Sequence, residues 1–147
     1  MGFDHVKGKV LVVDDSPEMR RYLQTLLELN SYRVQTASSG VEAVQLLMAG
    51  ADFDVVLLDL EMPQMDGFVT LDRIRCLRTD LKVIMCSGVM DPACSRKAMH
   101  LGAEAFLVKP VRHLYLTAAL ERCIHRAPFD HRAVRPEVIP FPVSRPS

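Results

Sequence analysis

Five short apolar runs alternate along the chain with segments in which apolar residues recur at helical spacing. Four of the runs, including VVLL and VIMC, are continuous rather than alternating, which is typical of parallel strands buried on both faces. The segments between them, and one after the last, have the period of an amphipathic helix. The predicted strands are KVLVV, YRVQT, DVVLL, KVIMC and AFLV, at residues 9–13, 32–36, 54–58, 82–86 and 105–108.

Residues that favour helix starts stand in front of the helical segments. Ser16 is followed by a proline, and Asp91-Pro92 repeats that pattern of an N-cap residue before a proline at the first helical position. Ser39 followed by Glu42 predicts a capping box. Strands that alternate with helices predict the α/β class, with one doubly wound parallel sheet covered on both faces in a three-layer (βα)5 arrangement.

Composition narrows the classes of function. Lys and Arg together number 18, as do Asp and Glu, and no basic stripe favours direct contact with nucleic acid. No apolar run approaches the roughly 20 residues that span a bilayer, so no membrane partner is expected. Four cysteines without a CxxC pair are typical of free thiols in a reducing compartment, which predicts a cytoplasmic protein.

The chain is long enough for one domain, which we place at residues 1–126. Residues 127–147 hold five of the nine prolines and show no helical period, so they are interpreted as a proline-rich tail or linker.

Polar residues stand where four of the predicted strands end. Asp14 and Asp15 follow the first strand, Asp59 the third, Ser87 the fourth and Lys109 the fifth. Because parallel strands share one carboxyl edge, we expect these side chains to meet there. Each alone is explained by a helix cap, a strand end or a surface lysine, but together they predict a site.

Three neighbouring carboxylates repel one another and need a cation, and hard oxygen ligands without His or Cys favour Mg²⁺. A carboxylate can also attack phosphorus and form an acyl phosphate. In that reaction Lys109 would supply a fixed positive charge and Ser87 a hydroxyl donor to a phosphoryl oxygen. We expect Asp59 to be positioned at an open edge of the sheet rather than buried.

The motifs VVDD (12–15), LLDLEMPQMDG (57–67), CSG (86–88) and LVKP (107–110) resemble, in order and spacing, the signatures of the receiver domains of two-component response regulators. The resemblance extends over about residues 8–126. It implies a flavodoxin-like sheet in the order 2-1-3-4-5. It also implies a phosphorelay signal transduction function, in which Asp59 accepts a phosphoryl group from a histidine kinase or a histidine phosphotransfer protein.

The same resemblance assigns metal ligands. It implies that Asp15 and Asp59 coordinate Mg²⁺ directly, that Asp14 acts mainly through water, and that Glu61 contributes its backbone carbonyl. It further implies a cis peptide bond between Lys109 and its proline.

A phosphorylation switch is also implied by the resemblance. Ser87 would move toward the new phosphoryl oxygens and Phe106 would turn inward, which remodels the surface made by the fourth helix, fifth strand and fifth helix. A downstream protein target would bind that surface. A phosphorylation-dependent homodimer is left open, although the fifth strand has a single acid, Glu104, near its start.

Three other interpretations are considered in addition to a stand-alone response regulator. The chain is compatible with the receiver fragment of a larger multidomain regulator. An aspartyl-nucleophile Mg²⁺ phosphohydrolase would commonly have a second Asp two residues after the nucleophile, where this chain has Glu61. A degenerate receiver that acts only as a scaffold would lack a site residue, and none is missing. We therefore expect self-phosphorylation and autodephosphorylation, but no separate enzymatic substrate.

Glu61 and Val89 lie two residues after Asp59 and Ser87, at positions where members of the family tune the lifetime of the phosphoryl group. We predict that Glu61→Ala changes the rate of autodephosphorylation with little loss of phosphorylation. The decay of the phosphorylated protein measures that rate, and a rate equal to that of the wild type would contradict the prediction.

Overall fold

Strands and helices alternate throughout residues 5–89 and 91–124, the part of the chain that this computed structural model describes. The predicted boundary at residue 126 and the tail lie outside the described residues. The third and fourth strands end one residue later than predicted, so Asp59 and Ser87 are themselves the last residues of strands. The elements are β1 Gly8–Val13, α1 Pro17–Leu29, β2 Tyr32–Ala37, α2 Gly40–Met48, β3 Val55–Asp59, α3 Gly67–Leu77, β4 Lys82–Ser87, α4 Pro92–His100, β5 Ala105–Val108 and α5 His113–Ile124.

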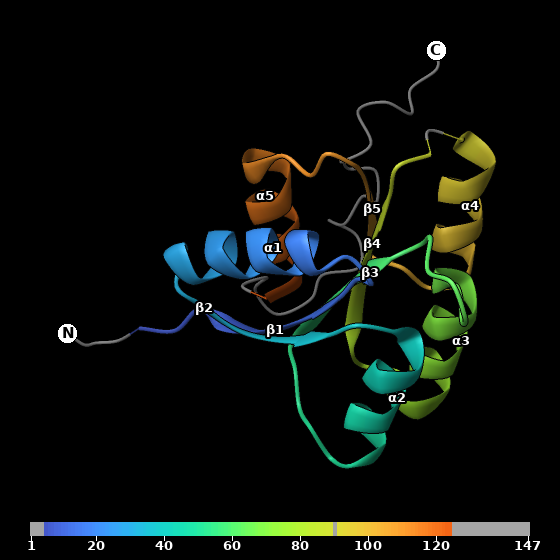
Figure 1. Ribbon diagram of the computed structural model, residues 1–147, viewed down its shortest axis with the longest axis horizontal. Coiled ribbons are helices and arrows are strands. Elements are labelled where there is room, and N and C mark those ends of the chain that lie inside the picture. The colour runs from blue at the N-terminus through green and yellow to red at the C-terminus, as the bar shows by residue number, and fades with distance from the viewer. Residues whose placement is uncertain (1–4, 90, 125–147) are drawn as a thin grey trace, which may run out of the picture.

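All five strands are parallel and lie in the order β2-β1-β3-β4-β5. Figure 1 shows α1 and α5 on one face of the sheet and α2, α3 and α4 on the other. The predicted three-layer, doubly wound fold is therefore confirmed. The strand order reverses between β1 and β3, and in such sheets the crevice at the carboxyl ends of those two strands is where ligands bind.

The central strands bury their side chains on both faces. Leu11 and Leu58 pack in the core beneath α2, α3 and α4, whereas Val12 and Leu57 pack in the core beneath α1 and α5. All four are at most 1% exposed. This two-sided burial is the reason that the strands are continuous apolar runs rather than alternating ones.

The predicted helix caps are present. Ser16 and Asp91 cap α1 and α4 through their side chains. The Ser39 hydroxyl accepts a hydrogen bond from the backbone N–H of Glu42 (3.1 Å), as predicted. The Glu42 carboxylate, however, accepts from the backbone N–H and hydroxyl of Ser38 rather than from Ser39. The reciprocal contact of the capping box, from the Glu42 side chain, is thus made to Ser38 instead of to the N-cap residue Ser39.

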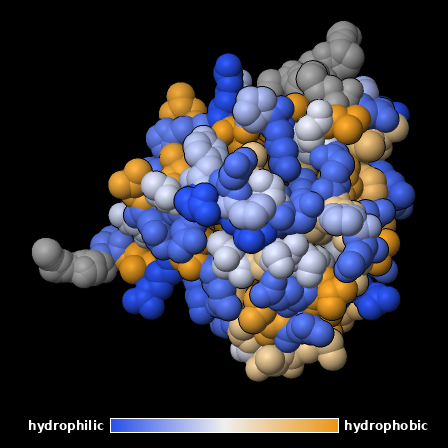
Figure 2. All heavy atoms as spheres, viewed as in Figure 1, coloured by the Kyte–Doolittle hydropathy of each residue, from blue (hydrophilic) through white to orange (hydrophobic). Residues whose placement is uncertain are grey.

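On the face shown in Figure 2, hydrophilic side chains dominate the centre and apolar atoms form small, separated groups. The large exposed apolar side chains are likewise distributed over several helices, for example Leu29 on α1, Met48 on α2 and Leu114 on α5. Within residues 5–89 and 91–124, none of the helices has both the length and the apolar character that crossing a membrane requires.

Gly67 begins α3 in close contact with the end of β3. A Cβ atom at this position would lie 2.6 Å from Leu60 Cα and 2.7 Å from the carbonyl oxygen of Asp59. Both atoms belong to the backbone and cannot rotate away. The Asp-Gly pair therefore allows α3 to start against the strand that ends in Asp59.

We predict that Gly67→Ala lowers the free energy of unfolding by about 1–3 kcal/mol, because the added methyl group forces a backbone shift. Urea unfolding measures the loss. Gly88→Ala is the matched control, since its nearest contact would be Glu61 Oε1 at 4.0 Å. Equal stability of the two variants would show that the contact at Gly67 has no energetic consequence.

Candidate functional site

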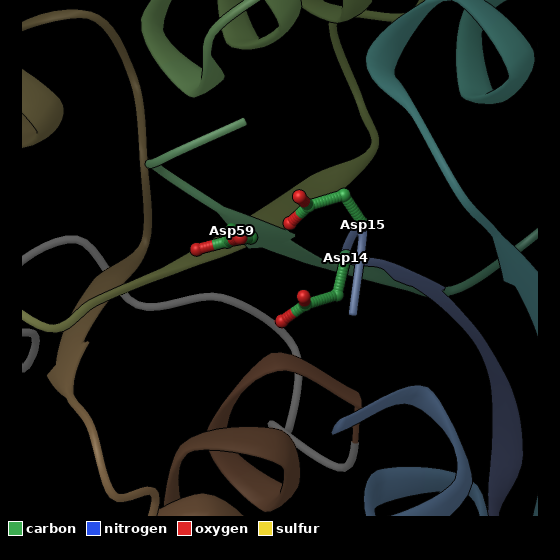
Figure 3. Close-up of side chains that lie close together, drawn as sticks. All are labelled: Asp14, Asp15 and Asp59. Atoms are coloured by element: carbon green, nitrogen blue, oxygen red, sulfur yellow. The ribbon is translucent and has the colours of Figure 1, made fainter. Parts of the chain in front are cut away.

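The carboxyl edge of the sheet brings the predicted acids together. Asp14 and Asp15 follow β1, and Asp59 ends the neighbouring strand β3. Each of the three offers a carboxylate oxygen, and these oxygens all lie within 4.8 Å of one another. Figure 3 shows the three side chains side by side, those of Asp14 and Asp15 coming from one segment and that of Asp59 from the strand next to it.

The three acids differ in burial. Asp59 is 3% exposed and Asp14 is 2% exposed, whereas Asp15 is open to solvent. The prediction that Asp59 is positioned rather than buried is therefore wrong about burial. The reason is that Asp59 lies within β3, opposite Cys86 in β4, and the pairing continues past it through a hydrogen bond from Leu60 N to the Cys86 carbonyl (2.8 Å).

Lys109 supplies the charge that these buried acids require. Its Nζ lies 2.9 Å from Asp59 Oδ1 and 3.2 Å from Asp14 Oδ2. Its backbone N–H donates to the Ser87 carbonyl (2.8 Å), which holds the residue next to the end of β4. The peptide bond between Lys109 and Pro110 is cis, as the resemblance implies. Residues far apart in sequence thus form one ion-paired cluster.

Burial and charge shift the pKa values in this cluster. Burial raises the pKa of Asp59 to about 6, against the opposing hydrogen bond from Lys109. Burial disfavours the charged form of Lys109, but its hydrogen bond to Asp59 and the charges of both acids outweigh that effect and raise its pKa. Burial also raises the pKa of the adjacent Cys86 thiol to about 12, so Cys86 is a neutral neighbour.

Further contacts hold Asp14 in place. Its Oδ1 accepts from the backbone N–H of Ser16 (2.9 Å), and its backbone carbonyl accepts from Arg20 Nη1 (2.8 Å). The sequence did not single out Arg20, because nothing in a helical pattern indicates that a side chain on α1 reaches back to a strand end. Asp14 is therefore held in a fixed position.

Ser87 and Glu61 make a contact that the sequence did not predict. The fully buried Ser87 donates its hydroxyl proton to Glu61 Oε2, and its oxygen accepts from the backbone N–H of Val89 (2.9 Å). The backbone N–H of Gly88 donates to Glu61 Oε1 (3.1 Å). The sequence predicted a backbone carbonyl ligand and a tuning position for Glu61, but no local pattern indicates that its side chain contacts the end of another strand.

The two other predicted residues lie outside this cluster. Phe106 is 2% exposed and packs in the core beneath α2, α3 and α4 with Ala98 and Ala103. Val89 is 48% exposed. The inward turn of Phe106 on phosphorylation stays a prediction, and it would start from a ring that is already buried.

The chemistry of the donor set suits a hard divalent cation. The cluster offers carboxylate oxygens from two adjacent strands, with one acid open to solvent and neither His nor Cys among the three. Mg²⁺ prefers such ligands. A nucleophilic carboxylate beside a fixed ammonium group is also a suitable arrangement for binding a transferring phosphoryl group.

Comparison with known proteins identifies the family. The family model of the response regulator receiver domain matches residues 10–121, so the chain belongs to this family. A probable transcriptional regulator, ycf27 of Guillardia theta, is 38% identical over 120 residues, which cover 82% of this chain and 46% of that protein. The two-component response regulator ARR10 of Arabidopsis thaliana is 43% identical over 105 residues, which cover 71% of this chain and 19% of that protein.

Solved structures support the same family assignment. The Vibrio cholerae chemotaxis protein CheY4 superposes with a TM-score of 0.73 at 32% identity, covering 78% of this chain and 97% of that one. CheY in a CheX-CheY-BeF3-Mg complex from Borrelia burgdorferi superposes with a TM-score of 0.73 at 30% identity, covering 77% of this chain and 86% of that one. The chain spans less than half the length of the two regulators above. It contains a receiver domain of two-component signalling.

The raised pKa of Asp59 predicts how stability depends on pH in the absence of divalent cations. Because the folded-state value of about 6 exceeds the model value of 3.8, the folded state holds this proton more tightly than the unfolded state does. The free energy of unfolding should therefore fall as pH rises from about 4 through about 6. At one pKa unit per 1.4 kcal/mol, the loss is at most about 3 kcal/mol.

Urea unfolding between these pH values measures the fall. Asp59→Asn should abolish it and be more stable than the wild type above neutral pH. Asp15→Asn, which changes an exposed acid, should retain it. A fall of equal size in Asp59→Asn would assign the effect to another group.

Proposed function

We propose that this protein is a phosphorelay response regulator whose Asp59 accepts a phosphoryl group from a histidine kinase or a histidine phosphotransfer protein. The observation that carries the proposal is the ion-paired cluster, in which Lys109 Nζ lies 2.9 Å from Asp59 at the edge where Asp14 and Asp15 converge. Family membership supports the same conclusion.

In the proposed transfer, a carboxylate oxygen of Asp59 forms a bond to phosphorus while the bond from phosphorus to the leaving group breaks, and the leaving group keeps the bonding electron pair. Asp59 must be ionised to attack, and it is so above its pKa of about 6. Lys109 keeps its ammonium charge and neutralises the phosphoryl oxygens. Asp15 and Asp59 directly, Asp14 through water and the Glu61 carbonyl would hold Mg²⁺, which supplies further positive charge between the two anions.

The proposed chemistry needs no separate substrate. The domain would catalyse its own phosphorylation from a donor and its own dephosphorylation, with Ser87 donating its hydroxyl to the phosphoryl group. The described residues around the cluster belong to the sheet edge and its loops, which supports a switch rather than a phosphohydrolase with a substrate-binding insertion.

We further propose that a downstream protein binds the surface formed by α4, β5 and α5. A phosphoprotein of this kind would act through that surface alone or through further domains. The solved complex of CheY with CheX supports a protein partner, and the greater length of ycf27, a probable transcriptional regulator, supports further domains. The four free cysteines favour a reducing, cytoplasmic location.

We predict that acetyl phosphate with Mg²⁺ adds one phosphoryl group to the protein and that Asp59→Asn adds none, because the nucleophile is lost. Intact mass spectrometry counts the groups. Asp72→Asn, an exposed acid on α3, is the matched control and should be phosphorylated like the wild type.

Two results would oppose the proposal. Phosphorylation that persists in Asp59→Asn would move the acceptor to another residue. Repeated turnover of a phosphoester such as p-nitrophenyl phosphate would instead favour the phosphohydrolase.

A further inference from the structure

The side chain of Glu61 reaches from the segment after β3 to the end of β4. One carboxylate oxygen accepts the hydroxyl proton of Ser87, and the other accepts from the backbone N–H of Gly88 at 3.1 Å. The backbone N–H of Glu61 itself lies 3.3 Å from Asp59 Oδ1. One residue therefore contacts both the proposed phosphoacceptor and the proposed phosphoryl-binding hydroxyl.

Both of these donors are already used. A serine hydroxyl carries one proton and a backbone amide carries one, so a second acceptor gains a full hydrogen bond only at the expense of the first. The Val89 carbonyl oxygen also lies within reach of the Ser87 hydroxyl, but at the longer distance of 3.4 Å. The Ser87 oxygen is in addition held by the backbone N–H of Val89 (2.9 Å). A phosphoryl oxygen on Asp59 is only an acceptor, and it can therefore engage Ser87 only after the bond from Ser87 to Glu61 breaks.

We propose that Glu61 is an internal competitor of the phosphoryl group, a positioning residue that holds Ser87 and Gly88 in the resting arrangement until Asp59 is phosphorylated. The proposal rests on the phosphoacceptor function of Asp59. On phosphorylation the two donors pass from the Glu61 carboxylate to phosphoryl oxygens, and the carboxylate returns to solvent.

The exchange is physically reasonable in both directions. Glu61 is exposed, so its carboxylate can be hydrated when it loses its two partners. A phosphoryl group carries more negative charge than a carboxylate and offers three strong acceptor oxygens. It therefore competes effectively for the same donors once it is bound to Asp59, and its loss allows Glu61 to take them back.

A simpler effect of Glu61 would be repulsion, because its negative charge lies near an incoming anion. The two effects differ in their dependence on Ser87. Competition for the hydroxyl acts through Ser87 and vanishes when that hydroxyl is removed, whereas charge repulsion remains. A double-mutant cycle between the two residues separates these effects.

The test compares wild type, Glu61→Ala, Ser87→Ala and the double variant. The initial rate of phosphorylation by acetyl phosphate with Mg²⁺ is measured for each, and beryllofluoride titrations followed at the Gly88 amide by NMR repeat the cycle at equilibrium. Glu61→Ala should raise the rate and the beryllofluoride affinity about three- to tenfold, the value of one hydrogen bond. In the Ser87→Ala background the same substitution should give a clearly smaller gain, because only the competition for the Gly88 N–H remains.

Glu104→Ala is the matched control, because Glu104 is a partly exposed glutamate at the amino end of β5, the opposite edge of the sheet. It should leave both measurements unchanged. If Glu61→Ala raises the phosphorylation rate and the beryllofluoride affinity equally in both Ser87 backgrounds, charge repulsion rather than competition explains the effect, and the proposal is overturned. No gain in either background would also overturn it.

Failure of the inference is distinguishable from failure of the proposed function. If the wild type takes up no phosphoryl group at Asp59, the proposed phosphoacceptor function is wrong. The contact itself is tested without phosphorylation, since Glu61→Ala should shift the Gly88 amide resonance of the resting protein and Glu104→Ala should not. An unshifted Gly88 resonance in Glu61→Ala would overturn the inference by itself.

Discussion

The ion pairs of Lys109 with Asp59 and Asp14 are the interaction on which the site depends. Two carboxylates, each at most 3% exposed, lie close enough to repel one another, and the lysine that directly follows β5 forms an ion pair with both. Burial of unpaired charge is costly, so the lysine makes this arrangement compatible with a folded protein. The compensation is incomplete, since the pKa of Asp59 stays raised. The cluster is therefore poised to accept further positive charge.

The sheet supplies the geometry that this electrostatic arrangement needs. β1 and β3 are hydrogen-bonded neighbours with their carboxyl ends at one edge, while the chain between them passes through β2 and two helices. The strands that carry the acids are packed into a core on each face of the sheet, with central side chains that are almost fully buried. Acids distant in sequence are thus held within reach of one another by apolar packing.

Hydrogen bonds from residues outside the strands fix two of the site's side chains. Asp14 is held by Ser16 and Arg20, and Ser87 is held by Glu61 and Val89. The first pair fixes an acid of the proposed metal site, and the second occupies the hydroxyl that a phosphoryl group would use in the proposed transfer. In the proposed switch, phosphorylation would replace the hydrogen-bond partners of Ser87 with phosphoryl oxygens.

Much of this protein is determined locally in its sequence. Continuous runs such as VVLL predict buried parallel strands, and Ser16 and Asp91 predict helix starts. Carboxylates, a hydroxyl and a lysine at the ends of four strands predict the site. These signals act over a few residues, so they can be found in the sequence alone. Tertiary structure decided what depends on neighbours. It buried Asp59 against β4, displaced the capping partner of Glu42 and turned the Glu61 side chain toward Ser87. Burial, pKa and long-range hydrogen bonds depend on the distances between elements, and those distances arise only when the cores pack.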